Sequence, residues 1–334
     1  SIFNYKADNM LCREAYQSHL SGGYHMEAQK KTLTVFTPAY NRAYTIHKCY
    51  ESLRRQTLKD FVWLVVDDGS EDETADLIKE WQKRDNGFEI KYVYKKNGGM
   101  HTAHNTAYEN IDTLLNVCID SDDYMTDDAV EKIVSFWQKY GSEKYAGIIA
   151  LDCTKDGEII GSRLEHDRKD TTLSGFYSRG GKGDKKLIYR TDVMKKYPPY
   201  PVFEGEKYVS LAYKYSLADK DYTLLIMDEP VCVVEYMADG SSTNMFKQYL
   251  RNPKGFAFIR KTDMQTAGNF KELMRCCVHY VSSSIIAKNK NFLKESPKKG
   301  ATLLAVPFGA ALTLYIKKKS KGFMNVNGFN EKKG

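Results

Sequence analysis

Three carboxylates follow a short apolar run in the first half of the chain. The run is residues 117–119, and the cluster after it is Asp120-Ser121-Asp122-Asp123. Ionised carboxylates this close together repel each other and are costly to bury, so they need a positive partner. Divalent Mg²⁺ or Mn²⁺ prefers oxygen ligands, and phosphate oxygens suit the rest of its shell. The cluster predicts a metal–diphosphate site at the end of a strand. The alternative is a turn whose aspartates cap a helix that begins near Ala129.

The elements that would position this cluster alternate between apolar runs and segments with helical spacing. Strands are expected at residues 33–36, 61–66, 90–94, 117–119 and 145–151, and helices at residues 43–55, 70–84, 100–108 and 128–140. Ser70 and Glu73 have the spacing of a capping box for the second helix. The alternation predicts an α/β fold with a doubly wound, mostly parallel sheet, which binds ligands at the carboxyl ends of its strands. Asp67-Asp68-Gly69-Ser70, Asn97-Gly98-Gly99 and the aspartate cluster should gather at that edge.

The pattern is less regular after residue 151. We expect a glycine-rich basic loop at 175–183, strands at 186–189 and 224–227, a third apolar run at 231–234, and helices from residue 246 onward. Three parts follow: a tail over residues 1–30, an α/β domain over 31–246 and a basic helical region over 247–334. The chain starts with Ser1, and we expect part of the tail to come from cloning.

Charge is distributed unevenly. The net charge is +7, but residues 247–334 hold 18 lysines and arginines against 4 acids, so the first 246 residues are net acidic. Within the basic region, residues 301–316 carry no charge and are bracketed by lysines. These 16 residues would span roughly 24 Å as a helix, less than the ~30 Å hydrocarbon core of a bilayer. An interfacial segment on anionic headgroups is expected. The alternative is a C-terminal helix buried against the body.

The cysteines indicate a reducing compartment. There are seven of them, an odd number, with no pair spaced as CxxC. This usage is typical of reduced cysteines in the cytoplasm and argues against a disulfide framework or a zinc site. We therefore expect a cytoplasmic protein.

Several motifs occur in an order that matches a known family. Thr37-Pro38-Ala39-Tyr40-Asn41-Arg42, Gln56-Thr57-Leu58-Lys59-Asp60-Phe61, Val66-Asp67-Asp68-Gly69-Ser70, Asn97-Gly98-Gly99 and Asp120-Ser121-Asp122-Asp123 follow one another. Over roughly residues 31 to 240 the chain resembles the family 2 inverting glycosyltransferases with the GT-A fold. The resemblance implies a nucleotide-sugar donor, usually a UDP-sugar, and a divalent metal, Mn²⁺ or Mg²⁺.

The resemblance also implies roles for individual residues. Tyr40 would pack on the donor base, and Asp68 would accept the uracil N–H, unless Asp67 does so; Asp67 could instead cap the next helix. Asp122 would bind the metal, and Asp120 would face the ribose or the metal's water shell. Asp123 would bond a sugar hydroxyl or order its loop. The full expected donor set is Pro38, Tyr40, Asn41, Arg42, Asp67, Asp68, Asn97, Gly98, Gly99, His104, Asp120, Ser121, Asp123, Asp184 and Lys185.

The chain departs from the family pattern at two places. His104 stands where many members have Arg, although a related subset has a His after the Gly-Gly pair. His101 or His104 would then reach the diphosphate or a donor hydroxyl, or both are structural. Some relatives also have a metal-binding His near the position of Glu235, where this chain has none.

Inverting transfer needs a base that takes the proton of the acceptor hydroxyl, and a metal that stabilises the departing diphosphate. The segment Phe203-Glu204-Gly205-Glu206 resembles the family's acidic motif in this half of the domain. Glu206 is the first candidate and Glu204 the second. Alternatively, both are surface acids at the start of a helix.

We therefore expect a metal-dependent inverting glycosyltransferase of bacterial surface-polysaccharide synthesis, as in capsule or cell-wall assembly. It would act on a glycan or lipid-linked acceptor at the inner face of the cell membrane, bound peripherally through its basic region. A nucleotidyltransferase is one alternative, but Pro38-Ala39-Tyr40-Asn41 is not the basic glycine-rich loop such enzymes need. A nucleic-acid-binding protein is the other, and the uncharged segment at 301–316 argues against it.

Overall fold

The structure is a computed structural model of the 334-residue chain. It describes residues 30–235 and 245–330, with side chains up to residue 320. The chain divides into two compact units, Ser1–Lys31 and Thr32–Gly334. All elements below belong to the second unit. The tail predicted over residues 1–30 lies almost wholly outside the described residues.

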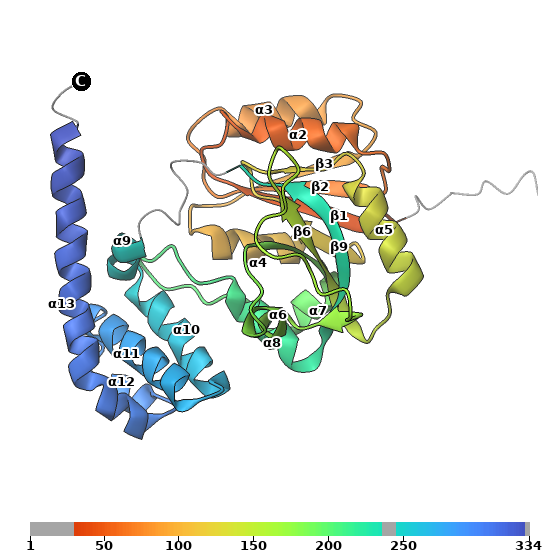
Figure 1. The fold of residues 1–334 in the computed structure, drawn as a ribbon. Coiled ribbons are helices and arrows are strands. Elements are labelled where there is room, and N and C mark those ends of the chain that lie inside the picture. Colours follow the sequence, from red (N-terminus) through yellow and green to blue (C-terminus); the bar gives the residue numbers. More distant parts are fainter. Residues whose placement is uncertain (1–29, 236–244, 331–334) are drawn as a thin grey trace, which may run out of the picture. The chain divides into compact units, whose positions relative to one another are not determined.

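The first half of the second unit forms four parallel strands. In space their order is β3 (Glu89–Tyr94), β2 (Phe61–Asp67), β1 (Leu33–Ala39) and β4 (Leu115–Cys118). Helices α2 (Ile46–Arg55), α3 (Thr74–Gln82) and α4 (Met100–Asn110) connect them. This arrangement confirms the predicted doubly wound α/β fold, and Figure 1 shows helices on both sides of the sheet.

The second half extends the same sheet with strands of both directions. Strand β8 (Lys185–Arg190) runs antiparallel to β4 and to β6 (Tyr145–Cys153), and β9 (Thr223–Val233) runs parallel to β6. Two short strands, β5 (Tyr124–Met125) and β7 (Asp170–Thr171), pair antiparallel with β9. The sheet therefore has nine strands among the described residues.

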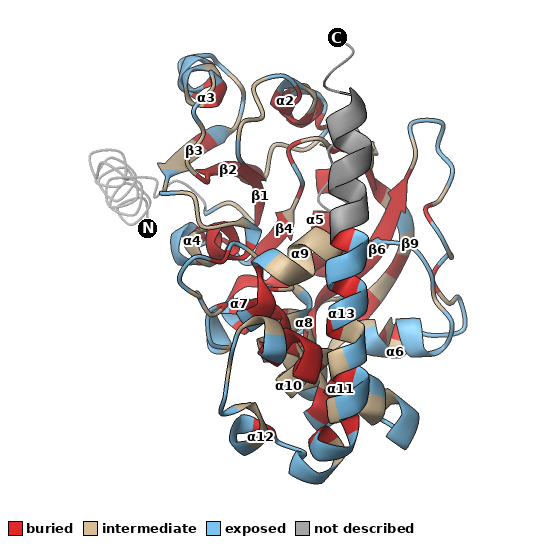
Figure 2. Ribbon diagram, turned by 90° about the vertical axis from the view of Figure 1, so that its left-hand side faces the viewer, coloured by how far each residue is buried: buried red, intermediate tan, exposed pale blue. Residues whose placement is uncertain are grey.

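Helices cover both faces of the sheet. Alternate residues of β1 and β2 face α2, α3 and α5 (Ala129–Tyr140) on one side. The other residues of these strands face α4, α7 (Thr191–Lys196) and α8 (Ala212–Asp221). Figure 2 shows the central strands as mostly buried. A sheet buried on both sides explains the continuous apolar runs in the sequence.

Aromatic stacking fills the core under α2 and α3. The ring centroids of Tyr50 and Trp81 lie 4.1 Å apart with the planes nearly parallel, and Trp63 stacks against both at 6.0 and 6.1 Å. The indole Nε1 of Trp63 donates a hydrogen bond to Thr37 Oγ1 at 3.0 Å, so its polar atom is satisfied. This cluster fixes α2 and α3 on β1 and β2, the strands whose ends carry the predicted donor loops.

Two local predictions are wrong, and a third underestimates the length of a strand. Ser70 does not form a capping box, because its Oγ accepts a hydrogen bond from the Asn41 amide, and α3 begins only at Thr74 without a side-chain cap. The first part of the predicted loop at 175–183 is helix α6 (Leu173–Ser178), which Thr172 Oγ1 caps by accepting from the Gly175 amide. The strand predicted at 224–227 is longer than expected, because β9 runs from Thr223 to Val233 and takes in most of the apolar run at 231–234.

The C-terminal region is helical, as predicted. It contains α9 (Met245–Arg251), α10 (Pro253–Thr266), α11 (Phe270–Ile286), α12 (Phe292–Glu295) and α13 (Lys299–Asn330). The predicted boundary between residues 246 and 247 falls inside α9. Helix α11 packs against both α10 and α13.

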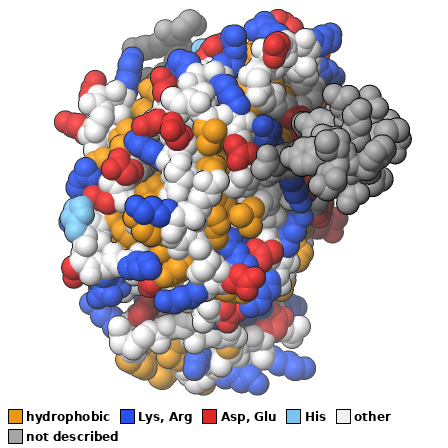
Figure 3. All heavy atoms as spheres, turned by 90° about the vertical axis from the view of Figure 1, so that its right-hand side faces the viewer, with side chains coloured by type: hydrophobic (Ala, Val, Ile, Leu, Met, Phe, Trp, Pro, Cys, Tyr) orange, Lys and Arg blue, Asp and Glu red, His pale blue; other side chains and the backbone are white. Residues whose placement is uncertain are grey.

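Charges of both signs are mixed on the face of the molecule that Figure 3 shows. Acidic and basic side chains alternate there, with small apolar patches between them. Such a face does not provide the single-sign field that attracts a polyanion.

Replacement of Trp63 by alanine should destabilise the fold strongly. The side chain is fully buried, and its removal leaves a cavity beside Tyr50 and Trp81 and takes away the indole N–H that Thr37 Oγ1 accepts. We expect the free energy of unfolding to fall by about 3–5 kcal/mol. Urea unfolding followed by circular dichroism would measure this change. Leu114→Ala is the control, because Leu114 is 48% exposed; equal effects of the two substitutions would contradict the described packing.

Candidate active site

The loop after β1 carries the first of the expected donor residues. Pro38 is buried within β1, and Tyr40 is 44% exposed directly after it. Asn41 has a φ of +52° and its Oδ1 accepts a hydrogen bond from the Glu71 amide at 2.8 Å. The Arg42 amide donates to Thr74 Oγ1. The loop is thus fixed to the loop after β2, and the Tyr40 ring is available to a ligand.

The end of β2 is held by Asp67, which is fully buried. Its Oδ1 accepts from the Ser70 amide at 2.7 Å, and its Oδ2 accepts from the Tyr92 hydroxyl at 2.7 Å. The carboxylate therefore shapes the turn after β2 and does not cap α3, which starts later. The Tyr92 hydroxyl loses its proton less readily, because burial and then the bond to Asp67 raise its pKa.

The next residue, Asp68, holds a second loop. Its Oδ1 accepts from the Gly98 amide at 2.9 Å and from Lys95 Nζ, and its Oδ2 accepts from the Gly99 amide at 2.8 Å. Gly99 is the residue before the first turn of α4, where a negative charge is favourable. A carboxylate offers about four acceptor positions, so these three donors leave roughly one. The role of Asp68 as reader of the donor base stays a prediction.

Glycine is required at position 99. Its φ is +93°, and a Cβ there would lie 2.0 Å from the carbonyl oxygen of Lys207. The close approach brings the segment that contains Glu204 and Glu206 against the Asn97-Gly98-Gly99 loop. More than a hundred residues separate the two segments in the chain, so sequence spacing alone could not show that they are neighbours.

Two buried histidines lie in the first turns of α4. Burial lowers the pKa of His101 to about 4 and that of His104 to about 3, so both are neutral at pH 7. His104 packs edge-on against Phe36, with its Nε2 3.7 Å from Cys118 Sγ. It is 1% exposed, so the expected contact between His104 and the donor does not fit its position. Neither ring nitrogen of His101 has a hydrogen-bond partner among the described residues.

The aspartate cluster lies at the carboxyl end of β4. Asp120 is exposed, Asp122 is half-buried, and Ser121 and Asp123 are buried. The Asp123 amide donates to the Asp120 carbonyl, and its Oδ1 accepts from the Glu235 amide at 3.3 Å. Burial raises the pKa of Asp123 to about 7, which Lys186 opposes and the neighbouring carboxylates reinforce. The helix-cap alternative fails, because Asp128 occupies the residue before α5.

A largely buried lysine, Lys186, lies near this cluster, and sequence analysis missed it. Lys186 Nζ lies 3.6 Å from Oδ1 of Asp152, which is 2% exposed at the end of β6. Burial alone would lower the pKa of Lys186, but the charges of Asp152, Asp123 and Asp120 raise it well above its usual value. The lysine is therefore a fixed cation. The available signal was a lysine at the start of an apolar strand, Lys186 to Tyr189.

Lys185, the neighbour that the sequence favoured, has a structural role. Its Nζ donates to the carbonyl oxygens of Ile160, Lys182 and Asp184 at 2.9 to 3.1 Å, and burial lowers its pKa. These contacts fix the turn before β8, so the expected contact with the donor does not fit. Asp184 is exposed, and its role stays a prediction.

Glu206 binds the start of α10. Its Oε1 accepts from the Lys254 amide and its Oε2 from the Gly255 amide, both at 2.9 Å, and the side chain is 9% exposed. A Cβ on Gly255 would lie 2.1 Å from the Tyr208 carbonyl oxygen, so the segment and the helix are in close contact. Each carboxylate oxygen keeps one free lone pair. Glu204 is exposed on the same segment.

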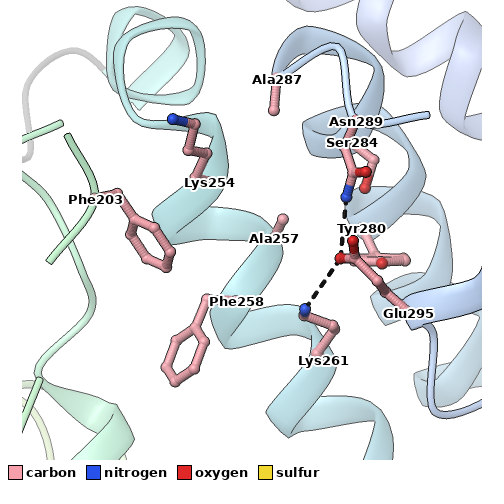
Figure 4. Close-up of a pocket in the computed structure, with 10 residues that line it drawn as sticks. All are labelled: Phe203, Lys254, Ala257, Phe258, Lys261, Tyr280, Ser284, Ala287, Asn289 and Glu295. Carbon is pink, nitrogen blue, oxygen red and sulfur yellow. Dashed lines mark hydrogen bonds and ion pairs between the residues drawn. The ribbon is translucent and has the colours of Figure 1, made fainter. Parts of the chain in front are cut away.

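A small cavity lies beside Phe203, the residue before this segment. It has a volume of about 230 Å³, and Figure 4 shows it between Phe203 and the side chains of α10 and α11. Lys261 and Glu295 form an ion pair at 3.5 Å on its wall. No residue of the expected donor set lines it, so we do not assign it to the donor.

The side-chain oxygens of the aspartate cluster are of the kind that ligate a divalent cation. Hard oxygen ligands gather there, and burial, reinforced by the charges of Asp120 and Asp122 and opposed by Lys186, raises the pKa of Asp123. Within residues 30–235 and 245–320, no group of three His, Cys, Asp or Glu side chains is arranged to hold a metal. The aspartates therefore offer a partial site, which oxygens from a ligand would complete.

The family follows from comparison with known domains. Residues 34–197 match the model of the family described as "Glycosyl transferase family 2". These residues form a family 2 glycosyltransferase domain. The matched region includes the loops after β1, β2 and β3, the aspartate cluster and Lys186.

Curated proteins match the glycosyltransferase domain over part of their length. Glycosyltransferase GlyA of Streptococcus pneumoniae is 32% identical over 115 residues, which is 34% of this chain and 16% of that protein. The uncharacterised glycosyltransferase EpsJ of Bacillus subtilis is 32% identical over 94 residues, which is 28% of this chain and 27% of that protein. Chondroitin synthase of Escherichia coli is 33% identical over 107 residues, or 32% of this chain and 15% of the synthase. The chain thus matches about a quarter or less of each relative.

Solved structures confirm the GT-A fold of the glycosyltransferase domain. S. aureus TarS, residues 1–349 in complex with UDP-GlcNAc, superposes with a TM-score of 0.53 at 16% identity, covering 82% of this chain and 79% of that one. The mannosyltransferase PcManGT of Pyrobaculum calidifontis, in complex with GDP-Man and Mn²⁺, gives 0.51 at 13% identity, covering 92% and 94%.

Substitution of Asp68 by asparagine should loosen the Asn97-Gly98-Gly99 loop. The amide side chain has one acceptor oxygen and no charge, so it cannot satisfy both glycine amides and Lys95. We expect the free energy that holds this loop closed to fall by about 1.4 kcal/mol or more. Hydrogen exchange at the Gly98 and Gly99 amides should therefore be at least about tenfold faster. Exchange measured by mass spectrometry would test this. Asp112→Asn is the control, because Asp112 has only an exposed ion pair with Lys91; unchanged exchange in Asp68→Asn would contradict the contact.

Proposed function

We propose that this glycosyltransferase domain transfers a sugar, with inversion, from a nucleotide sugar to a hydroxyl of a glycan or lipid-linked acceptor. The observation that carries the proposal is the aspartate cluster at the carboxyl end of β4, where the buried Asp123 lies beside Asp120 and Asp122, inside a family 2 domain. The loops after β1 and β2 lie at the same edge of the sheet, since β1, β2 and β4 are parallel. A nucleotide with a diphosphate and a sugar is long enough to contact all three.

We propose a UDP-sugar as donor. The TarS structure named above contains UDP-GlcNAc, and the likeness of fold supports this class of ligand for the present chain. The exposed ring of Tyr40 is suited to stack on the base. Asp68 is kept as the proposed reader of the uracil N–H through its remaining acceptor position, and a loop movement has to expose it, since it is 4% exposed.

Asp122 would hold a divalent metal, with Asp120 beside it or on its water shell. When bound, a divalent cation stabilises the negative charge that develops on the departing diphosphate. The protein's part is to hold the aspartates at the end of a rigid strand. The positive charge of Lys186 reduces the repulsion among these aspartates.

Glu206 is proposed as the base, and its two bonds to α10 orient it. The acceptor hydroxyl oxygen would attack the anomeric carbon while the bond from that carbon to the diphosphate breaks. The base takes the hydroxyl proton. Each Glu206 oxygen has a free lone pair besides the one bonded to an amide, so the carboxylate is positioned without being saturated.

The acceptor and the cellular location rest on the C-terminal region. We propose that the protein works in the cytoplasm at the inner face of the cell membrane and contributes to surface polysaccharide synthesis. The basic charge of residues 247–334 supports contact with anionic headgroups. Relatives named chondroitin synthase and hyaluronan synthase support a glycan product.

The donor and the metal can be tested together. We expect slow hydrolysis of at least one UDP-sugar with Mn²⁺ or Mg²⁺, and a loss of about 100-fold or more in Asp122→Asn. Release of nucleoside diphosphate from a panel of UDP- and GDP-sugars would measure it. Asp112→Asn should retain full activity. Hydrolysis of no UDP-sugar, or equal turnover in the presence of EDTA, would refute the proposal.

Two matched variants distinguish the proposed catalytic role of Glu206 from its structural contact with α10. Glu206→Gln should reduce transfer to acceptor by about 100-fold or more while UDP binding, measured by calorimetry, is kept. It should also lower the melting temperature, because the new NH₂ group faces an amide donor. Glu204→Gln should leave both properties nearly unchanged. If Glu204→Gln abolishes transfer and Glu206→Gln does not, the assignments must be exchanged.

A further inference from the structure

Helix α13 places its small and hydroxyl-bearing residues against the protein. The buried positions are Thr302, Ala305, Gly309, Thr313, Ile316 and Ser320. They recur every three or four residues and so form one stripe along the helix. Only one of the six is a large apolar residue. A helix on the surface of a water-soluble domain normally buries its large apolar side chains instead.

Close packing on α11 explains this stripe. A Cβ on Gly309 would lie 2.5 Å from the Val281 side chain and 3.0 Å from the Val278 carbonyl oxygen, so the two helices approach closely there. Thr313 Oγ1 bonds Ser282 Oγ at 3.0 Å. Small residues at the contact and hydroxyl bonds between helices are features of helix pairs in lipid, where large apolar side chains gain nothing by facing each other.

The opposite side of α13 carries the large apolar residues. The exposed positions between residues 303 and 315 are Leu303, Leu304, Pro307, Phe308, Ala311, Leu314 and Tyr315. All seven are apolar or aromatic, and the five largest are 49 to 70% exposed. Figure 2 shows exposed and buried residues alternating along this helix. The segment Lys299–Ser320 is long and apolar enough to cross a membrane, and an 18-residue window of it has a mean hydropathy of 1.4; only 28% of that window is buried by the described residues.

Lysines stand at both ends of this exposed face. Lys298 and Lys299 precede it and Lys317, Lys318 and Lys319 follow it, all exposed. No acid occurs between residues 296 and 330. Lys319 Nζ lies 5.8 Å from the centroid of the Tyr315 ring, which places an aromatic residue at the boundary between the apolar and the basic parts. An apolar face bracketed by lysines complements acyl chains beside anionic headgroups.

We propose that the face formed by Leu303, Leu304, Phe308, Leu314 and Tyr315 lies in the surface layer of an anionic bilayer, with α13 parallel to the membrane plane. The stripe from Thr302 to Ser320 stays on α11. A spanning orientation does not suit this helix, because the uncharged part of α13 is shorter than the hydrocarbon core, at roughly 24 Å. This inference deepens the membrane location proposed above and does not depend on the sugar-transfer chemistry.

Vesicle flotation tests the face. The full chain should float with vesicles of phosphatidylglycerol and phosphatidylcholine, and binding should fall at least about tenfold on phosphatidylcholine alone. The combined variant Leu303→Gln, Leu304→Gln, Phe308→Gln and Leu314→Gln should lose at least about tenfold in bound fraction. The control variant, Leu114→Gln with Phe270→Gln, changes equally exposed apolar residues elsewhere and should bind like the parent. Flotation unchanged by the α13 substitutions, or absent in the parent, would overturn the proposal.

Depth measurement tests the orientation. Single substitutions Leu303→Trp, Phe308→Trp and Leu314→Trp should each show fluorescence quenched to a similar extent by lipids brominated near the headgroup. Leu114→Trp should not be quenched, and the native Trp63, Trp81 and Trp137 are buried and give a constant background. Much weaker quenching of Phe308→Trp than of Leu303→Trp by these bromines would show a spanning helix and overturn the parallel orientation.

Two further readouts distinguish lipid binding from self-association and from a loss of catalysis. If the face instead binds a second copy of the chain, light scattering would show a dimer that the α13 variant loses, without vesicle binding. UDP-sugar hydrolysis measured without vesicles should be the same in the parent and the α13 variant. Loss of hydrolysis in both would refute the sugar-transfer proposal and leave the membrane proposal standing.

Discussion

The Asp68 carboxylate accepts hydrogen bonds from the amides of Gly98 and Gly99. The edge of the sheet at which the sugar donor is proposed to bind depends on these contacts. The carboxylate ties the turn after β2 to the start of α4, and Lys95 completes its charge balance. Residue 99 is a glycine in this position, so the carbonyl oxygen of Lys207 can lie where a Cβ atom would otherwise clash with it. The segment with Glu204 and Glu206 is thereby placed beside the loops that follow the parallel strands. One carboxylate thus joins elements from three distant parts of the chain.

The charges at the end of β4 are balanced less completely than those around Asp68. The three carboxylates after β4 are opposed by Lys186, whose charge is shared with the buried Asp152. One largely buried lysine lies among four acids, and burial, together with the charges of Asp120 and Asp122, raises the pKa of Asp123. A fold that needed only stability would not retain this arrangement. The residual negative charge is what a cation, and through it a diphosphate, would balance.

The sequence predicts the parallel half of the sheet well because each strand is an apolar run and each helix has a clear spacing. It also locates the loops at the strand ends, since these follow from strand direction alone. It fails where a side chain's partner comes from far along the chain. The sequence suggests that Ser70 caps a helix, but its Oγ accepts a hydrogen bond from the Asn41 amide instead. It also suggests that Lys185 binds a ligand, but the Nζ of Lys185 donates to three carbonyl oxygens of the protein. The importance of Lys186 arises from strand pairing with β6, and no local pattern encodes that.

The C-terminal helices connect the two ends of the proposed function. Glu206 is oriented by the first amides of α10, α10 packs on α11, and α11 packs on α13. The face of α13 that would contact lipid and the carboxylate that would accept the proton therefore belong to one continuous stack of helices. A membrane-bound acceptor could then approach from the lipid surface toward a base whose position is set by the same helices. In the proposed arrangement the basic region would orient the Glu206 segment as well as attach the protein to the membrane, and removing it would release both oxygens of Glu206.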